Sequence, residues 1–349
     1  MCKRIIGGEF AIDRCLKLES FTPNSILYAS GRGALKAILE HAIPKKNGVV
    51  LLPDYVCESV PDTVSEIGLK CIFYHIKSGF MPDCIDLIRK LKNVKAVVII
   101  NYFGMISEEV IEDVIKNIKK NNPEVKVIVD DVQNLFGIEN EHNCDYAFTS
   151  YRKWLPVPDG AIAIWNHSNR QERLILDFPN ESAKFSKYKF AGNVLKNYRN
   201  IIGDDICLEL LKKGEELVQE DISCSALTWT VTAVEKTDLS RIQEKRKRNA
   251  QILHDGLVSM GIYHCYSEAS TPLFVPIVLQ RGRDKIRQLM AENSIFCPIH
   301  WDCSWNLRYG IEGENELSCT ELSLICDQRY EEQDMVRELE ILRDGCKNI

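Results

Sequence analysis

Three features are missing from the sequence, and each absence removes a class of protein. No apolar run approaches the roughly 20 residues that a membrane-spanning helix needs. The 349 residues carry a formal net charge of -6, so there is no basic surplus of the kind that binds nucleic acid. No internal repeat and no low-complexity tract is visible. We therefore expect a globular protein that binds neither a nucleic acid nor a membrane.

The cysteines also lack a pattern. Fourteen of them are scattered along the chain without one CxxC pair, which favours free thiols in a reducing compartment over a disulfide framework. The first ten residues, MCKRIIGGEF, contain too short an apolar stretch for a signal peptide, so we expect a cytoplasmic protein. His300 and Cys303 lie three residues apart without a second ligand pair, and we expect no metal site.

Apolar runs of the kind that form buried strands alternate with amphipathic helical patterns, which is typical of a parallel sheet covered on both faces. The expected strands lie at 48–52, 69–75, 96–100, 125–129, 273–279 and 294–299, and the expected helices at 35–42, 87–91, 110–118, 241–257, 284–291 and 331–342. We predict an α/β protein with a three-layer α/β/α large domain at 20–235, built on a mainly parallel sheet. A smaller C-terminal α/β domain is expected at 236–349, together with 1–19.

Polar or small residues follow the ends of the strands expected in the large domain. Gly31, Asp54, Asn101 and Asp130 each come just after an apolar run. The carboxyl ends of parallel strands share one edge of the sheet, and ligands gather at that edge. The sequence therefore predicts a binding site there.

The turn from Ser30 to Gly33 separates an apolar run at 25–28 from a helical pattern. Free N–H groups and the positive end of a helix dipole favour an anion at such a turn, so it is a candidate phosphate site. A tight turn that needs glycine for its dihedral angles explains the same residues. The third glycine of the GxGxxG fingerprint and its ribose-binding acid are missing, which argues against NAD.

Lys153 lies in the segment SYRKWLPVPDG, between two further apolar runs. Pyridoxal 5'-phosphate requires from its protein a lysine for the Schiff base, an acid facing the pyridine nitrogen, an anion site for the phosphate, and a group that holds the ring. A lysine removed from water near other cations has a lowered pKa and reacts as the free amine. Lys153 is the candidate for this lysine, and an ordinary surface lysine is the alternative.

Asp130 is the candidate acid, because it ends the strand expected at 125–129. A carboxylate in this position keeps the pyridine nitrogen protonated and makes the ring an electron sink. Asp131 competes for the role, but side chains alternate along a strand, so only one of the two faces the site. For either residue, an acid that caps a turn is the alternative. Ser150 is a second candidate for the phosphate, or an ordinary loop serine.

Ser150 and Lys153 also form an SxxK motif, which carries the nucleophile of penicillin-binding proteins and β-lactamases. There the motif opens a helix and is joined by SDN and KTG. Here WLPVPDGA cannot begin a helix, and the nearest analogue of KTG is Lys236-Thr237-Asp238. We therefore reject a serine hydrolase.

The segment 172–219 is polar and is expected to be helical. Its basic residues are interpreted as a solvated face, with attraction of an anionic substrate as the alternative. They are Lys184, Lys187, Lys189, Lys196, Arg199, Lys212 and Lys213.

Taken together, these motifs resemble the DegT/DnrJ/EryC1/StrS family of sugar aminotransferases, which are fold-type-I pyridoxal phosphate enzymes. The similarity covers most of the chain. It rests on SGRGAL at Ser30, LLPDYVCES at Leu51, INYFG at Ile100, VDDVQNLF at Val129, SYRKWLPVPDG at Ser150, IFCPIHW at Ile295 and CDQRY at Cys326. RKW followed by PDG replaces the commoner FSFHxxK and GEGG pattern, as expected for a divergent branch.

The resemblance implies roles for individual residues. Lys153 becomes the Schiff-base lysine, Asp130 the pyridinium partner and Gln133 a second ring contact. Because the lysine is not replaced by histidine, as it is in the dehydratases of this family, the implied reaction is transamination. The cofactor-binding residues implied besides these are Ser30, Gly31, Arg32, Asn101 and Ser150.

The position of the aromatic residue that stacks on the cofactor ring in this family falls at Cys57, which is not aromatic. Tyr55 or Tyr102 is expected to take its place. His300 and Trp301 match the family's substrate-side motif and are expected to meet the sugar together with Tyr102, although a core histidine beside a tryptophan is the alternative. Asn197, Tyr198 and Arg199 resemble a motif that reaches the phosphate of the partner subunit, without its glycine.

The function implied is transfer of an amino group from glutamate to a keto group on a nucleotide-linked sugar, in a ping-pong reaction. A homodimer with sites at the subunit interface is implied too. Three alternatives remain: transfer to a small keto acid, another pyridoxal phosphate reaction such as an aldol or elimination step, and a non-catalytic protein that keeps the fold for binding.

Overall fold

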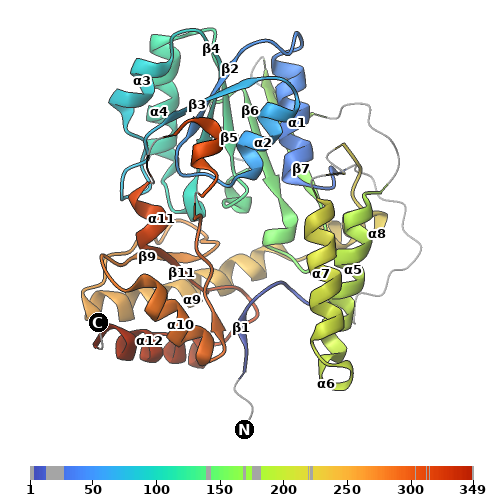
Figure 1. Ribbon diagram of the computed structural model, residues 1–349, viewed down its shortest axis with the longest axis vertical. Helices are drawn as coiled ribbons and strands as arrows, with labels where there is room; N and C mark the ends of the chain where they lie inside the picture. Colours follow the sequence, from blue (N-terminus) through green and yellow to red (C-terminus); the bar gives the residue numbers. More distant parts are fainter. Residues whose placement is uncertain are drawn as a thin grey trace.

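The computed structural model describes residues 4–12, 27–138, 143–167, 170–174, 182–218, 220, 223–302, 304–311, 313 and 315–347. Figure 1 shows a large upper unit built around one sheet, a helical pair beside it and a smaller unit below. The expected run at 25–28 lies only partly within these residues. The boundary expected between 19 and 20 lies outside them, and the division at 235 stays a prediction.

The central sheet has seven strands in the order β3-β2-β4-β5-β6-β7-β8. Strands β2 to β6 are parallel, whereas β7 and β8 run antiparallel to their neighbours. Apolar side chains of β2, β4 and β5 are buried on both faces, as a parallel sheet covered by helices requires. Their bounds are β2 (Val49–Pro53), β3 (Lys70–Tyr74), β4 (Val94–Ile100), β5 (Lys126–Asp130), β6 (Tyr146–Ser150), β7 (Ala161–His167) and β8 (Arg170–Arg173).

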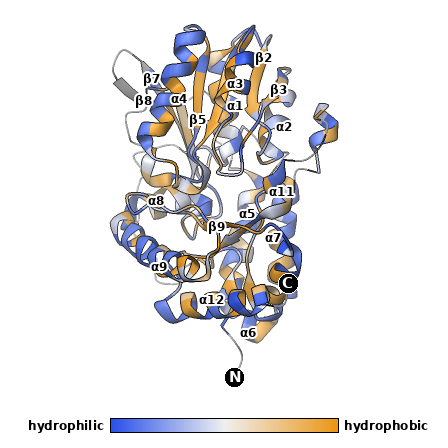
Figure 2. Cartoon of the chain, turned by 90° about the vertical axis from the view of Figure 1, so that its left-hand side faces the viewer, coloured by the Kyte–Doolittle hydropathy of each residue, from blue (hydrophilic) through white to orange (hydrophobic). Residues whose placement is uncertain are grey.

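Helices cover both faces of this sheet (Figure 1). They are α1 (Gly31–Ala42) and α2 (Ser59–Glu66), which pack on each other, and α3 (Cys84–Lys90) and α4 (Glu108–Asn121), which do the same. Helix α1 packs against β6 and β7, with Leu35, Ile38 and Leu39 buried as the helical pattern predicts. The hydropathy colouring of Figure 2 shows apolar strands inside and helices with one polar side.

A helical pair stands beside the sheet. Helices α5 (Lys184–Leu195) and α7 (Asp205–Leu217) pack along each other, and the short α6 (Arg199–Ile202) joins them at the tip (Figure 1). Gly192 of α5 permits the contact, because a Cβ there would lie 2.8 Å from the Leu211 side chain. Helix α8 (Thr228–Lys236) then returns the chain to the sheet.

The smaller unit has its own core. Helices α9 (Leu239–Met260), α10 (Arg283–Glu292) and α12 (Glu332–Lys347) surround an antiparallel pair, β9 (Val275–Val278) and β11 (Glu321–Leu324), while α11 (Glu316–Thr320) leads into β11. Its fully buried members include Ile6, Leu253, Leu257, Val275, Ile277, Leu324, Met335 and Leu342. Ile6 comes from the other end of the chain, because β1 (Ile6–Gly7) pairs with β10 (Ile295–Phe296). Gly7 has a φ of +100° and lies so close to β10 that a Cβ would meet the Phe296 oxygen at 2.7 Å.

Several local predictions differ from the structure. The strand expected at 294–299 is only the two residues of β10, because Pro298 lacks an amide to continue a ladder. Strand β8, with the sequence RQER, occupies the start of a segment expected to be helical. Strand β11 was not expected, since two polar residues interrupt its apolar pattern.

The eleven cysteines within the described residues are all free. No helix in the described part of the chain is long and apolar enough to span a membrane.

Candidate active site

Two cavities meet at Lys153. The smaller, here called the rim cavity, has a volume of about 120 Å³ and lies at the carboxyl edge of the sheet. The larger, here called the large cavity, has a volume of about 800 Å³ and is bounded by the smaller unit and the N-terminal segment. Arg152, Lys153 and Glu215 line both. The rim cavity also contains Ser30, Gly31, Arg32, Cys57, Asp130, Gln133, Ser150 and Trp301.

Lys153 ends a single 3₁₀ turn, Tyr151–Lys153, that follows β6 directly. The next residue, Trp154, is fully buried, donates its indole N–H to the Val132 oxygen at 3.0 Å and packs edge-on against Phe136. This anchor fixes the turn. The lysine itself makes no hydrogen bond or ion pair with another residue that the structure describes, so its amine is available to a ligand.

The charge state of Lys153 is set by its surroundings. Burial lowers its pKa, and the positive charge of Arg152 lowers it further, while Cys57 and Asp130 act in the opposite direction. This is the environment in which a lysine reacts as the free amine.

Asp130 stands at the end of β5 and is 7% exposed. Its Oδ1 accepts the Val132 N–H at 2.9 Å. Burial raises its pKa to about 6, although the Val132 N–H and the positive charge of Lys153 lower it. Asp131 is fully buried and its Oδ1 accepts from the Asn134 amide at 3.0 Å, so it supports the loop. Of the two acids, Asp130 lines the rim cavity.

The N-terminus of α1 opens into the rim cavity. The hydroxyl of Ser30, the N-cap, accepts the Gly33 N–H at 3.2 Å. Gly31 and Arg32 belong to the first turn, whose N–H groups have no partner inside a helix. Ser150 lies across from them, with its Cβ 3.7 Å from where a Cβ on Gly31 would sit. The four residues expected to bind a phosphate are therefore together at one end of the cavity.

Gln133 contributes an unpaired donor to the same cavity. Its Oε1 accepts the Phe103 N–H at 2.9 Å, and its Nε2 is buried without a partner among the described residues. A buried amide donor of this kind indicates a missing acceptor. Asn101 has a different place: its side chain exchanges hydrogen bonds with Ile106 and does not line the cavity.

The aromatic residues are arranged differently from the expectation. Cys57 does line the rim cavity, but Tyr55 and Tyr102 are fully buried behind it, with the Tyr102 hydroxyl donating to the Tyr55 oxygen at 2.5 Å. Trp301 lies 5.4 Å from the Tyr55 ring, between centroids, and lines the rim cavity together with Phe148 of β6.

A chain of charges that the sequence analysis missed forms the wall shared by the two cavities. Arg152 binds both oxygens of Glu215, at 3.2 and 3.3 Å. Lys189 bridges Glu215 at 2.8 Å and Glu9 at 2.7 Å. Burial opposes the ionisation of Glu215, but Arg152 and Lys189 outweigh it and hold its pKa well below the usual range. Lys189 is 2% exposed, so its assignment to a solvated face is wrong.

Arg246 of α9 lies in the wall of the large cavity and is 1% exposed. Its guanidinium stacks 4.7 Å over the Trp154 ring and donates to Gln328 and to the oxygens of Pro272 and Leu273. It forms no ion pair with a described carboxylate, since Asp327 is engaged by Arg329 at 2.7 Å.

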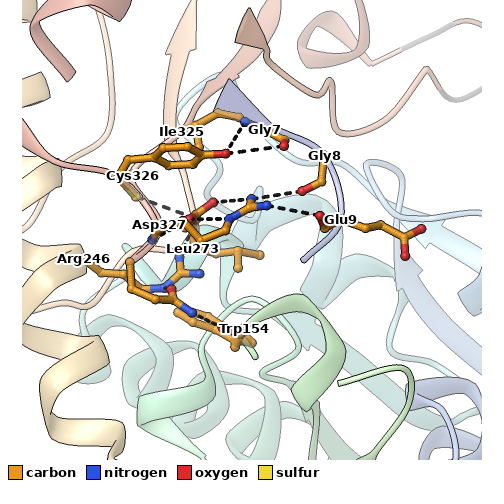
Figure 3. A network of polar contacts seen from close by, with 12 residues as sticks. Gly7, Gly8, Glu9, Trp154, Arg246, Leu273, Ile325, Cys326 and Asp327 are labelled. Carbon is orange, nitrogen blue, oxygen red and sulfur yellow. Dashed lines mark hydrogen bonds and ion pairs between the residues drawn. The ribbon is translucent and has the colours of Figure 1, made fainter. Parts of the chain in front are cut away.

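The N-terminal segment closes the large cavity on one side. Arg329 donates to the oxygens of Gly8 and Glu9, at 3.0 and 3.2 Å, and lies 4.3 Å from the Phe10 ring. Figure 3 shows Gly8 and Glu9 on the side of Asp327. The ends of the chain therefore meet at this wall.

His300 lines the large cavity and Trp301 the rim cavity, so these neighbours face different spaces. Cys303 lies outside the described residues.

Comparison with known proteins identifies the fold. No protein-family model and no curated protein matches the chain. Among solved structures, Spr1654 from Streptococcus pneumoniae in its PLP form is 12% identical, with 93% of this chain and 88% of that chain covered and a TM-score of 0.67. A DegT DnrJ EryC1 StrS aminotransferase from Brucella abortus is 16% identical, with 92% and 86% covered and a TM-score of 0.59. DesI in the presence of its TDP-sugar product is 13% identical, with 91% and 79% covered and a TM-score of 0.60.

At these identities the likeness concerns the fold. The chain has the fold of the fold-type-I pyridoxal phosphate enzymes, and the predicted fold class is confirmed.

Proposed function

We propose that this protein is a pyridoxal phosphate-dependent aminotransferase that moves an amino group from glutamate to a keto group on a nucleotide-linked sugar. The observation that carries the proposal is the meeting of Lys153 and Asp130 in one cavity beside the open N-terminus of α1. Three of the four groups that pyridoxal phosphate requires are thus in one place. The free thiols support a reducing compartment, such as the cytoplasm.

The rim cavity fits this cofactor. The first turn of α1 and Ser150 would hold its phosphate, and Asp130 would pair with its pyridinium nitrogen. The unpaired amide donor of Gln133 suits the phenolic oxygen of the ring. Trp301, rather than Tyr55 or Tyr102, would contact the ring from the smaller unit, and Phe148 is the other aromatic residue that lines the cavity.

When bound, the cofactor acidifies the carbon that carries the amino group by drawing electrons into its ring. The residues of this chain then have simple tasks. Lys153 Nζ, whose lowered pKa leaves it able to accept a proton, takes and returns the proton as general base and acid. Burial raises the pKa of Asp130 to about 6, and the positive charge of a pyridinium would offset this and favour the carboxylate, while Trp154 holds the lysine turn in place.

Arg246 supports an amino donor that carries carboxylates. Burial of the charged Arg246 guanidinium without a carboxylate partner costs free energy, and binding of an anion would reduce that cost. Arg246 lines the large cavity, which begins at Lys153, so a carboxylate of glutamate would complete it during the first half of a ping-pong reaction.

The large cavity also suits the acceptor. Its volume of about 800 Å³ lies in the upper part of the range for ligand pockets and leaves room for a nucleotide-linked sugar. The TDP-sugar in the DesI structure supports this class of acceptor over a small keto acid, for which so large a space is unnecessary.

A homodimer is part of the proposal. The tip of the helical pair exposes a group of large apolar side chains, which a second copy would cover: Tyr198, Ile201, Ile206 and Leu208. Asn197, Tyr198 and Arg199 lie at the same end of the helical pair, which would contact the second copy in the proposed dimer.

The test is reduction with borohydride. Purified protein mixed with pyridoxal phosphate should become coloured, and borohydride should bleach it and leave the cofactor covalently attached to Lys153, identified by peptide mass spectrometry. Lys153→Ala should lose both the adduct and at least about 10²-fold in activity. Lys212→Ala, an exposed lysine of α7, serves as the control. A colourless protein, or an adduct that persists in Lys153→Ala, would contradict the proposal.

An aldol or elimination enzyme would pass this test, so a second measurement is needed. Incubation with ¹⁵N-glutamate and a keto-sugar nucleotide should yield a ¹⁵N-amino sugar and 2-oxoglutarate. Cofactor binding without any amino transfer would favour the non-catalytic alternative.

A further inference from the structure

His300 belongs to a chain of hydrogen bonds that begins in the core of the smaller unit. Its Nδ1 lies 2.9 Å from the Ser323 hydroxyl, and that hydroxyl lies 2.5 Å from Glu321 Oε1. The other oxygen of Glu321 accepts the His300 backbone N–H at 2.7 Å. Glu321 and Ser323 are both 0% exposed.

Strand β11 explains why these two residues meet the histidine. Side chains alternate along a strand, so Glu321 and Ser323 share one face while Leu322 and Leu324 share the other. The leucines enter the core of the smaller unit. The polar pair is thereby held rigidly against His300, beneath the wall of the large cavity.

The direction of the hydrogen bonds follows from the number of protons. A carboxylate only accepts, and a separation of 2.5 Å is typical of a hydroxyl that donates to an ionised oxygen. The Ser323 hydroxyl has one proton, which goes to Glu321. Towards His300 the same oxygen must accept, so the proton on the ring lies at Nδ1.

In the singly protonated ring, Nε2 is then the nitrogen without a proton. His300 lines the large cavity, its Nδ1 points to Ser323, and no hydrogen bond joins its Nε2 to another residue within the described ranges. The rings of Phe103 and Phe274, with centroids at 5.4 and 5.2 Å, fix the plane of the imidazole.

Elsewhere in the wall of the large cavity, few side-chain acceptors are free for a hydrogen-bond donor of a ligand. Each carboxylate that lines the cavity already faces a cation of the protein: Glu9 and Glu215 face Lys189, Asp284 faces Arg283, and Asp327 faces Arg329. Because the carboxylates of the wall are already paired, the acceptor nitrogen Nε2 of His300 suits a ligand hydroxyl better than a charged ligand group.

We propose that Glu321 and Ser323 lock His300 as the Nδ1–H tautomer, so that Nε2 accepts a hydrogen bond from a sugar hydroxyl in the large cavity. Glu321 and Ser323 are positioning residues, and His300 contributes to substrate specificity. The lock is independent of the catalytic proposal. Only the identity of the ligand rests on it.

The tautomer is measured directly by NMR on the full-length protein labelled with ¹⁵N-histidine. Two-bond ¹⁵N–¹H correlations at pH 8 distinguish Nδ1–H, Nε2–H and doubly protonated rings. The chain has seven histidines, and His300→Gln identifies the relevant signals. We expect a single Nδ1–H form. A ring protonated at Nε2, or at both nitrogens, overturns the lock.

Glu321→Gln provides the decisive variant. The amide oxygen must take the His300 backbone N–H, which leaves the NH₂ group to donate to Ser323. The serine proton then turns to Nδ1, and the ring proton moves to Nε2. We expect this variant to invert the tautomer, Ser323→Ala to give a mixture, and Ser323→Thr to retain the wild-type form. An unchanged Nδ1–H signal in both Glu321→Gln and Ser323→Ala overturns the proposal. Thermal melting identifies a variant that does not fold, in which case Ser323→Ala against Ser323→Thr decides.

TDP-glucose is the probe for the ligand. Binding is measured by calorimetry, and at saturation the Nε2 signal of wild-type protein should shift as it accepts a hydrogen bond. His300→Phe should weaken binding about tenfold, as expected for one hydrogen bond. Binding without any shift at Nε2 overturns the assignment of a sugar hydroxyl. Absence of binding counts against the nucleotide-sugar function proposed above, whereas the tautomer result stands by itself.

Discussion

The two cavities that meet at Lys153 are built in opposite ways. The rim cavity takes its polar residues mostly from loops that follow strands of one sheet, between Ser30 and Lys153. The large cavity takes its wall from segments as distant as Gly7 and Arg329. The hydrogen bonds between the strands of the sheet hold the rim cavity in place, whereas the large cavity forms only when distant parts of the chain pack together. The residues proposed for catalysis, which need exact placement, thus lie in the cavity that the sheet holds in place.

Charge distinguishes the cavities as well. In the rim cavity, burial raises the pKa of Asp130 and lowers that of Lys153, so both groups resist ionisation. In the wall of the large cavity, burial lowers the pKa of Arg329, but its pairing with Asp327 outweighs burial and raises it, so both groups keep their charge. The rim cavity is therefore suited to proton transfer, and the large cavity to recognition of charged and polar substrates.

The largest effect is expected from Asp130→Asn, which keeps the shape of the rim cavity and removes its negative charge. Loss of one such electrostatic partner should lower kcat at least about 10²-fold. Asp131→Asn is the matched comparison, because that acid contacts Asn134 instead of the cavity. It should lower the Tm more than the activity. The reverse ranking in steady-state kinetics would assign the pyridinium partner to Asp131.

Arg246→Gln tests the large cavity. We expect KM for glutamate to rise about tenfold to a hundredfold, with a smaller change in KM for the sugar, because the buried cation is removed from one substrate's site only. Arg248→Gln removes an exposed arginine of the same helix, paired with Glu332 at 3.3 Å, and should be neutral. Equal changes in both KM values would show that the site is shared. Arg246→Lys, which keeps the charge, separates this effect from misfolding.

Glu338, which lies beneath the large cavity, should make the stability of the protein depend on pH. Glu338 is buried and accepts from the Ile325 N–H at 2.9 Å and from Cys297, which lines the cavity. Burial raises its pKa to about 8. Between its unfolded pKa of roughly 4.3 and pH 8, the folded chain holds a proton that the unfolded chain has lost. Its contribution to stability is therefore fully present below that window and falls as the pH rises through it.

Glu338→Gln should remove this dependence, which is on the order of 1 kcal/mol per pH unit within the window. Urea unfolding at pH 5, 6.5 and 8 measures it, with the exposed Glu340→Gln of the same helix as the control. A variant whose free energy of unfolding still falls as steeply as that of the wild type would assign the effect to other groups.

The smallest effect is expected at Cys57. Its thiol lines the rim cavity but supplies no ring, so Cys57→Ala should change the Kd for pyridoxal phosphate by about threefold or less. Trp301→Ala should weaken it about tenfold, because an aromatic contact is lost. Fluorescence titration measures both. A larger loss at Cys57 would mean that Trp301 does not hold the ring.

The parts of the molecule that sequence reasoning predicted are those governed by local patterns. Strands β2, β4 and β5 are apolar runs, and α1 and α4 are periodic, so their positions agree closely with the expectation. Lys153 and Asp130 follow strands in the same way, which is why the predicted residues of the rim cavity lie together. Asn101 and Tyr102 follow a strand too, but their side chains serve the loop and the core.

The rest depends on contacts between distant residues. The ion pair of Arg152 with Glu215 spans 63 positions, and that of Lys189 with Glu9 spans 180. Nothing in a helical pattern of lysines indicates which one is buried, so the sequence predicts a solvent-exposed Lys189. The pairing of His300 with Glu321 and Ser323 likewise requires the packing of β11, a strand too short and too polar to be expected.

Arg152, Lys153 and Glu215 border both cavities, so two substrates that react in turn at Lys153 would meet the same three side chains. Two substrates that use the same site can occupy it only one at a time. Glutamate and the sugar nucleotide would each obstruct the other at high concentration, and the rate would pass through a maximum as either one is raised. The ratio of the two metabolites, more than the amount of either, would then set the flux through this protein.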